Sequence, residues 1–197
     1  DGSSDFYPDY RWGYFPSVSL GWRFSDENFM KKFSHFLSNG KLRSGCGQTG
    51  NISNEMGIRI FSQYGVDSRY VFGEAGYLGI ATTQLGNRTL SWETTSEFNI
   101  GLDLGFLDNR INLSLEYYNR RISDLLVKEK PLPFYNEVNK LATNSGKTQG
   151  QGFELTLNTV NISNKDFTWS TDDTFYLYRD KWLERDINWK PAAYEST

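Results

Sequence analysis

The most regular pattern of hydrophobic and polar positions in this chain lies between residues 92 and 126. Hydrophobic side chains occupy every second position in two long runs, and a short polar turn at Asp108 and Asn109 separates the runs. A repeat of two residues is the period of a β-strand, whereas a helix repeats every 3.6 residues. The pattern therefore predicts a hairpin of two strands, near 92–106 and 111–126, each with one apolar and one polar face.

Both predicted strands are more than twice as long as the average strand of a soluble protein, which has about 5–6 residues. A tilted strand that crosses a membrane needs about 9–11 residues. Apolar and polar positions that alternate over such a length are typical of outer-membrane barrels. On this hairpin and on a later strand, we expect these side chains to face lipid: Phe98, Ile100, Leu102, Leu104, Ile111, Leu113, Leu115, Phe153, Leu155 and Leu157.

The same alternation predicts four further strands, near 12–24, 41–49, 151–160 and 167–178. Six strands joined in sequence favour an all-β fold, an antiparallel up-and-down meander. One position breaks the pattern, because Asp173 falls on the apolar parity of the last strand. Either a β-bulge shifts the parity there, or Asp173 lies near the edge of the apolar face.

The connections between these strands alternate in length. The stretches 50–91 and 128–150 are long and show no sustained period, whereas 107–110 and 161–165 are short. Successive connections of a meander lie at opposite ends of the strands, so the long ones collect at one rim. Outer-membrane barrels place long loops outside the cell, and we therefore expect 50–91 and 128–150 to be external loops.

Two shorter features complete the expected architecture. Residues 25–37 predict a helix, with Ser25 as N-cap and acidic residues in the first turn. The loop 50–91 holds aromatic residues that either stack on sugars or form a small core of the loop itself. They are Phe61, Tyr64, Tyr70, Phe72 and Tyr77.

Composition narrows the classes of protein. The 197 residues have a net charge of −3 and a mean hydropathy of −0.60, and no run of 18 apolar residues exists that would form a transmembrane helix. A barrel strand is compatible with this hydropathy, because half of its side chains face water. Lys and Arg are scattered, so nothing favours nucleic acid as a partner. One Cys and one His leave no disulfide framework and no zinc site.

Motifs that suggest chemistry lack the context that the chemistry needs. Residues 45–50 match the dinucleotide fingerprint G-x-G-x-x-G, but no helix start follows to bind a pyrophosphate. His35 and Cys46 have no second ligand or catalytic neighbour in sequence. Adjacent carboxylates such as Asp172 and Asp173 point to opposite faces of a strand. We therefore predict no enzyme, no cofactor, no metal and no catalytic residue.

Five phrases, taken in order, resemble one family. They are Arg11–Ser19 with Gly21–Arg23, Lys41–Arg43 with Gly47–Asn51, Leu90–Thr95 with Asn99–Asp103, Tyr117–Asn119 with Asp124–Leu126, and Gly152–Leu155. Together they resemble the barrel of SusC/RagA-type TonB-linked outer-membrane transporters. Each phrase alone is short, whereas five in sequence across residues 1–185 are specific.

The resemblance implies a 22-stranded barrel in the outer membrane of a Gram-negative bacterium, filled by an N-terminal plug. It implies import of oligosaccharides or peptides, a SusD-like surface lipoprotein as partner, and energy relayed by the TonB complex. We expect residues 1–197 to be a piece of such a protein, about six strands from the later part of the barrel, without the plug. Six strands cannot close a barrel alone.

An alternative fold would explain the same alternation. In a soluble β-sandwich, used as a carbohydrate-binding or adhesin-like module, two sheets pack with their apolar faces together. The two folds differ in what covers the apolar side chains. A second sheet of this chain favours the sandwich, and exposure on one side of a single sheet favours the barrel.

Overall fold

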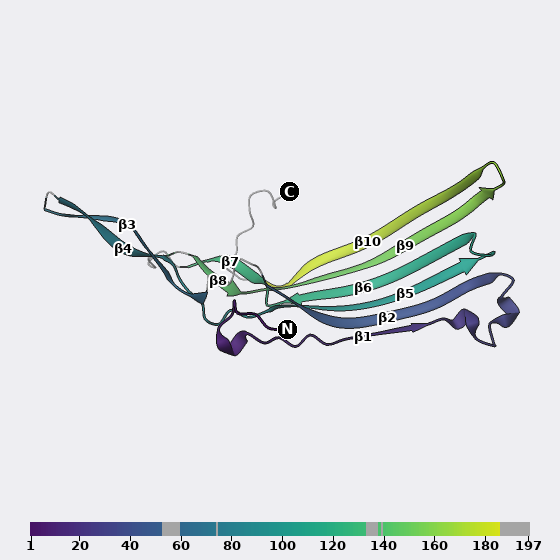
Figure 1. Cartoon of the computed structure of the whole chain (residues 1–197), viewed down its shortest axis with the longest axis horizontal. Coiled ribbons are helices and arrows are strands. Elements are labelled where there is room, and N and C mark those ends of the chain that lie inside the picture. Colours follow the sequence, from purple (N-terminus) through teal and green to yellow (C-terminus); the bar gives the residue numbers. More distant parts are fainter. Residues whose placement is uncertain (53–59, 74, 133–137, 139, 186–197) are drawn as a thin grey trace.

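The computed structural model describes residues 1–52, 60–73, 75–132, 138 and 140–185. Its centre is one six-stranded antiparallel sheet, in which the strands curve together along their length (Figure 1). In spatial order these strands are β1 (Ser17–Trp22), β2 (Leu37–Asn51), β5 (Glu93–Phe106), β6 (Ile111–Ser123), β9 (Lys147–Ser163) and β10 (Thr168–Glu184). Within this sheet, each strand pairs with the sheet strand that follows it in the sequence. The predicted all-β, antiparallel meander of six strands is therefore confirmed.

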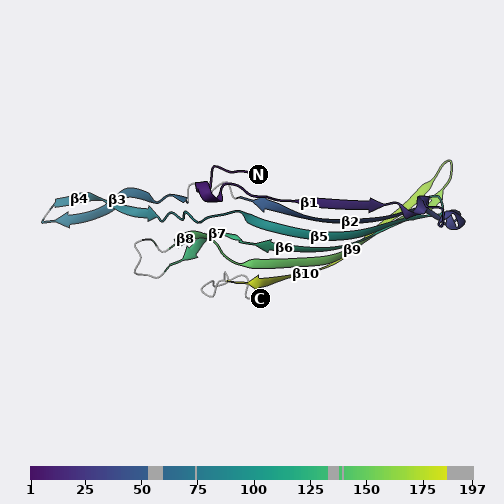
Figure 2. The ribbon, with the colours of Figure 1, turned by 90° about the horizontal axis from the view of Figure 1, so that it is seen from below.

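The two long connections contain strands of their own. β3 (Gln63–Phe72) pairs with β4 (Ala75–Gln84), and β7 (Leu126–Pro131) pairs with β8 (Lys140–Asn144). Both hairpins lie at the same end of the sheet, and β3–β4 extends well beyond it (Figure 2). The absence of a period in 50–91 and 128–150 therefore does not mean an absence of strands. Residues 53–59, 74, 133–137 and 139 of these connections lie outside the described residues.

The opposite end of the sheet holds the short connections, and here the predicted helix over 25–37 is wrong. The segment contains only two single turns of 3-10 helix, η2 (Phe24–Asp26) and η3 (Lys31–Phe33). Ser25 lies inside η2 and caps nothing; its hydroxyl bonds the Asp26 carboxylate at 3.2 Å. A third turn, η1 (Pro8–Tyr10), lies near the N-terminus. Among the described residues, no helix is long and apolar enough to cross a membrane.

Aromatic contacts explain why the segment between β1 and β2 bends instead of continuing as a helix. The rings of Phe24 and Phe29 both approach Trp22, with centroids 5.9 and 6.4 Å away. The ring of Phe36 lies 5.1 Å from that of Phe106 in β5. These contacts hold the segment against the turn end of the sheet.

The only fully buried apolar cluster of the described residues lies at the loop end and not under the sheet. It consists of Phe6, Ile60, Leu90 and Ala142, with Ile52, Trp92 and Leu126 packed against it. We call it the loop-base core, because it joins the N-terminal segment to the bases of both hairpins.

Polar side chains fasten the same region. The Asn144 side-chain amide donates to the carbonyls of Ser91 and Asp124, both at 2.8 Å. The Glu93 carboxylate accepts from the Asn51 amide at 3.0 Å and from the backbone N–H of Leu126 at 3.1 Å. The bases of the long connections are therefore tied to the strands that they join.

No second sheet covers the six-stranded sheet within the described residues. The close contacts between its elements are those of hydrogen-bonded neighbours, together with η2 against β2. The two hairpins lie beyond the end of the sheet (Figures 1 and 2). The arrangement expected of a β-sandwich is therefore not observed in this part of the chain.

The turn between β5 and β6 is conformationally demanding. Leu107, Asp108 and Asn109 have φ angles of 52°, 55° and 60°, in the left-handed region. Asp and Asn tolerate this region better than other L-residues do, and leucine has no such compensation. The turn is held from outside, because the Ser38 hydroxyl accepts the backbone N–H of Asp108 at 2.7 Å.

We predict that Leu107→Gly makes the protein more stable than Leu107→Ala by about 1 kcal/mol. Both changes remove the same half-exposed side chain, but only glycine relieves the left-handed backbone. Denaturant unfolding of the two variants measures the difference. Equal midpoints, or a lower one for the glycine variant, would show that the turn is not strained at this position.

Candidate functional site

The register of the sheet sorts its side chains into two faces. Residues directly opposite each other on antiparallel strands point to the same side. One row joins Leu104 to Leu113 and Leu157, and the next joins Leu102 to Leu115 and Leu155. Extended over the sheet, this register places all ten predicted lipid-facing residues on one side, which we call the apolar face.

Side chains of the apolar face are open to the surroundings. Phe98, Ile100 and Phe153 expose 44%, 39% and 37% of their surface, and the other seven predicted residues are half-buried between their neighbours. On β1 the exposure is larger, with Leu20 at 74%. An uncovered apolar surface that extends across a whole sheet needs an apolar environment or a partner.

The loop-end border of the apolar face runs diagonally over the strands. One row of opposed residues reads Val18, Cys46, Phe98, Asn119, Gln151 and Arg179, so it changes from apolar to polar and then to charged. At the turn end the apolar face reaches the row of Phe106 in β5. The bulge between Leu37 and Asn39 puts Leu37 of β2 opposite Phe106, and Ile111 of β6 lies on the other side of Phe106. The loop-end border therefore shifts across the sheet, whereas the turn-end border keeps the same row from β2 to β6.

A bulge extends the apolar face toward the turn end. The register between β9 and β10 shifts between Trp169 and Ser170, so that Trp169 pairs with Ile162 while Ser170 pairs with Val160. The other β9 residues of the apolar face have odd numbers. Because the bulge shifts this alternation by one residue, Ile162 also lies on the apolar face. The bulge does not remove Asp173, which still lies opposite Leu157 on the apolar face.

The opposite side, which we call the polar face, carries an ion network across three strands. Arg43 of β2 contacts Asp103 of β5 at 3.1 Å through Nε and Glu116 of β6 at 2.8 Å through Nη1. The Ser114 hydroxyl donates to the Asp103 carboxylate at 2.8 Å. One guanidinium therefore links two carboxylates, a geometry that suits its planar set of donors.

A glycine makes this arrangement possible. Gly101 stands directly between Arg43 and Glu116 in the register. A Cβ atom there would lie 2.7 Å from Cζ of Arg43, so the guanidinium lies against the backbone of β5 in the space that a side chain would fill. The sequence alone did not reveal this network, because it depends on the cross-strand register.

Tyrosines also lie on the polar face. The ring of Tyr118 covers Gly152, where a Cβ atom would come within 2.6 Å of it. Tyr176 and Tyr178 of β10 stack with their centroids 6.2 Å apart. The polar face thus combines carboxylates, an arginine that contacts two of them, and aromatic rings, as expected for a water-filled lumen wall.

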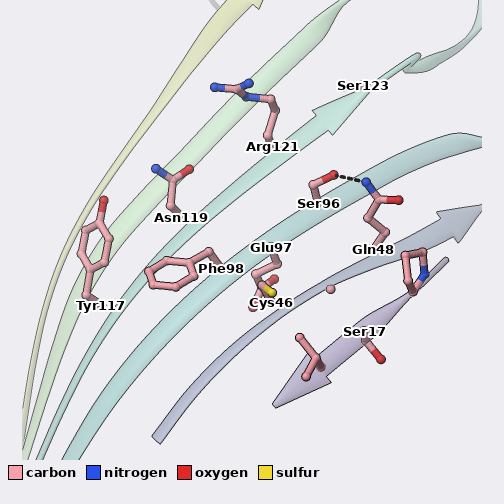
Figure 3. Close-up of a pocket in the computed structure, with 13 residues that line it drawn as sticks. Ser17, Cys46, Gln48, Ser96, Glu97, Phe98, Tyr117, Asn119, Arg121 and Ser123 are labelled. Carbon is pink, nitrogen blue, oxygen red and sulfur yellow. Dashed lines mark hydrogen bonds between the residues drawn. The ribbon is translucent and has the colours of Figure 1, made fainter. Parts of the chain in front are cut away.

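A hollow of about 740 Å³ lies at the loop-end border of the apolar face (Figure 3). Most of the residues that line it lie on this face, on β1, β2, β5 and β6. Phe98 and Tyr117 form apolar parts of its wall, and Arg121 lies toward the loop end. Gln48 donates from Nε2 to the Ser96 hydroxyl at 3.3 Å beside them.

The sequence motifs that suggest chemistry do not come together in one site of the structure. The glycines of 45–50 lie within the extended strand β2, so they form no turn before a helix. His35 is exposed between η3 and β2, and Cys46 is exposed on the apolar face. Within the described residues no three metal-ligating side chains gather.

The loop aromatics do not form the core of their loop. Phe61, Tyr64 and Tyr77 expose 58%, 69% and 50% of their surface, whereas the loop-base core uses Ile60 and Leu90 instead. The side chains of Tyr70 and Phe72 lie outside the described residues. The prediction that the loop aromatics form a core of the loop is therefore wrong for these three exposed rings. That they stack on sugars stays a prediction.

Comparison with known proteins agrees with this architecture. The family described as "TonB dependent receptor-like, beta-barrel" matches residues 1–192. TonB-dependent receptor P3 of Formosa agariphila is 36% identical over 187 residues, which cover 93% of this chain and 18% of that protein. TonB-dependent receptor SusC of Bacteroides thetaiotaomicron is 39% identical over 173 residues, covering 86% of this chain and 17% of that protein.

Solved structures give the same result. The structure titled "Structure of the RagAB peptide transporter" matches with a TM-score of 0.79 and 26% identity, over 95% of this chain and 20% of that one. Another state of the same importer, called "open-open", matches with a TM-score of 0.78. The chain belongs to the TonB-dependent receptor β-barrel family, in its SusC/RagA-type branch, and thus to the outer membrane of Gram-negative bacteria. It spans about a fifth of the length of these relatives.

We predict that Arg43→Met lowers the free energy of unfolding by about 1–2 kcal/mol, because it leaves Asp103 and Glu116 without their shared cation at a site about one-third exposed. Lys41→Met is the matched comparison, since Lys41 lies opposite Asp103 on the same strand and face as Arg43 and acts on this carboxylate only through its charge, without an ion-pair contact among the described residues. Denaturant unfolding compares the variants, and an equal loss in both would remove any special role for the network.

Proposed function

We propose that residues 1–197 form part of the wall of an outer-membrane TonB-dependent importer. In this proposal the apolar face contacts the hydrocarbon of the membrane and the polar face lines the lumen. The observation that carries it is the uncovered apolar band, whose loop-end border shifts across the strands. Barrel strands tilt by about 35–45°, so a membrane plane crosses the rows of a sheet obliquely, as the loop-end border of the band does.

The length of the apolar band also supports contact with the hydrocarbon of the membrane. On β5 the apolar positions run from Phe98 to Phe106, nine residues. At about 3.4 Å per residue and a tilt of about 40°, this length spans roughly 20–25 Å, the height of the apolar band of an outer-membrane barrel.

The proposal extends to the whole protein. The long connections, with hairpins β3–β4 and β7–β8, face the outside of the cell and shape a ligand chamber, and the loop-base core holds their bases. Cargo consists of oligosaccharides or peptides. A SusD-like surface lipoprotein docks on the loop side, and the TonB complex acts through parts of the protein outside residues 1–197. The relatives named SusC and RagAB support this assignment.

Nothing in this role requires covalent chemistry. The relatives reported above are named receptors and transporters, and the proposed mechanism is binding followed by gated passage along the polar face. We therefore propose that the chain contributes no catalytic residue, cofactor or metal site.

Spin labels on two adjacent residues test the orientation of the sheet. Leu115 and Glu116 are neighbours on β6 that point to opposite faces. In the full-length transporter, reconstituted in lipid and free of other cysteines, we predict that a nitroxide at Leu115→Cys collides with oxygen, which dissolves in hydrocarbon. The nitroxide at Glu116→Cys collides instead with a water-soluble nickel chelate.

Two outcomes contradict this prediction. If both labels prefer the nickel chelate, the apolar face does not contact lipid. If the preferences are reversed, the sheet is oriented with its polar face outward. Power-saturation electron paramagnetic resonance measures both collision rates on the same samples.

A further inference from the structure

Charged side chains of the apolar face gather at its loop-end border. Among the described strand residues, the cations of this face are Arg121, Lys147, Arg179 and Lys181. Its carboxylates are Asp173, which lies inside the band, and Glu184, which neutralises Lys147 at 2.7 Å. In this described part of the chain, Arg121, Arg179 and Lys181 have no acidic partner within ion-pair distance.

These three cations lie close together across the sheet. Arg121 of β6 and Lys181 of β10 lie in the same row, on either side of Gln149 in β9. Two strand spacings of about 4.8 Å put their backbones about 10 Å apart. Arg179 lies in the next row toward the apolar band, opposite Gln151.

The cluster does not reflect a basic protein, since the net charge is −3. The polar face of the same strands is acidic. Its carboxylates are Glu93, Glu97, Asp103, Glu116, Glu154, Asp172 and Asp180, against the cations Lys41, Arg43 and Arg120. Positive charge is thus concentrated where the apolar face ends at the loop side.

An amphiphilic hollow adjoins Arg121, the β6 member of this cluster. Arg121 contributes to the hollow of about 740 Å³ that Phe98, Tyr117 and Val18 also line (Figure 3). A cation therefore lies beside a hollow whose wall includes Phe98 and Tyr117 of the apolar band, together with polar residues and Glu97. A ligand that matches both features has an anionic head and an apolar tail.

We propose that this border binds the phosphorylated headgroup of a glycolipid in the outer leaflet, with an acyl chain along the hollow. Arg121, Arg179 and Lys181 bind the phosphate oxygens through charge-assisted hydrogen bonds, and the amides of Gln149 and Gln151 lie between them. This inference rests on the proposed function for the orientation of the sheet. Basic residues next to a membrane-spanning segment are a recognised basis for attraction to anionic lipid headgroups.

The test uses the full-length transporter, purified in detergent and titrated with lipid A that carries two phosphates. The same lipid A without its phosphates serves as the second ligand, and native mass spectrometry counts bound lipid. We expect the triple variant Arg121→Gln, Arg179→Gln, Lys181→Gln to lose affinity for phosphorylated lipid A by at least roughly tenfold. Arg120→Gln is the matched control, because Arg120 lies next to Arg121 but on the polar face.

Several results would overturn the inference. They are equal binding of both forms of lipid A, unchanged binding by the triple variant, and an equal loss in Arg120→Gln. A dimer that dissociates in the triple variant would assign the surface to a second copy of the protein instead.

The spin label at position 115, placed in the same variants, separates this inference from the proposed function. If the label lies in hydrocarbon while lipid A is not bound selectively, only the headgroup site is wrong. If the label lies in water, the orientation of the sheet is wrong and the proposed function fails with it. The label also shows that the triple variant is folded.

Discussion

Burial of the apolar face by a medium outside the chain is the interaction on which this structure depends. The sheet has no interior of its own, because the buried apolar cluster of the described residues lies at the loop base. Apolar surface removed from water contributes about 25 cal/mol per Å², and here that surface lies on Leu102, Leu115 and their neighbours across six strands. Water on both sides of the sheet would leave this contribution unrealised. The proposed hydrocarbon contact supplies it.

The backbone imposes a second constraint of the same kind. Within the described residues β1 and β10 are the edges of the sheet, and each of them pairs with a strand on one side only. Such edges are not tolerated in hydrocarbon, where no water satisfies their backbone N–H and C=O groups. Six strands are also fewer than the smallest barrels contain. The chain spans about a fifth of its relatives, and in the proposed protein the remaining strands pair with both edges and close the barrel.

Parts of this architecture were predictable from sequence because they depend on local periodicity. The alternation through Phe98 and Leu113 predicted two strands, their faces and the short turn between them. The helix expected over 25–37 failed because ring contacts of Phe24, Phe29 and Phe36 determine that segment, and contacts between distant residues are invisible to a local pattern. The strands β3 and β4 were missed for a related reason, since their sequence lacks a sustained alternation.

The sites on the two faces depended on register, which no single strand reveals. Arg43, Asp103 and Glu116 are far apart in sequence, and only the pairing of β2, β5 and β6 brings them together. The cations Arg121 and Lys181 likewise share a row only through β9. Their odd residue numbers already placed both cations on the apolar face. The signal available in the sequence was therefore the charged residues that follow the last apolar residue of a strand on that face. For Asp173, the bulge near Trp169 leaves its position inside the apolar face, and we have no physical explanation for it.

The most direct measurement of the central claim is the folding free energy of the full-length protein in lipid, with arginine placed at each position from Ile111 to Tyr117 of β6 in turn. If hydrocarbon covers the apolar face, arginine at Leu113 and Leu115 costs about 2–4 kcal/mol, the cost falls toward the ends of the band, and arginine at Ser114 costs far less. Equal costs at odd and even positions, or the larger cost at the even ones, would contradict it.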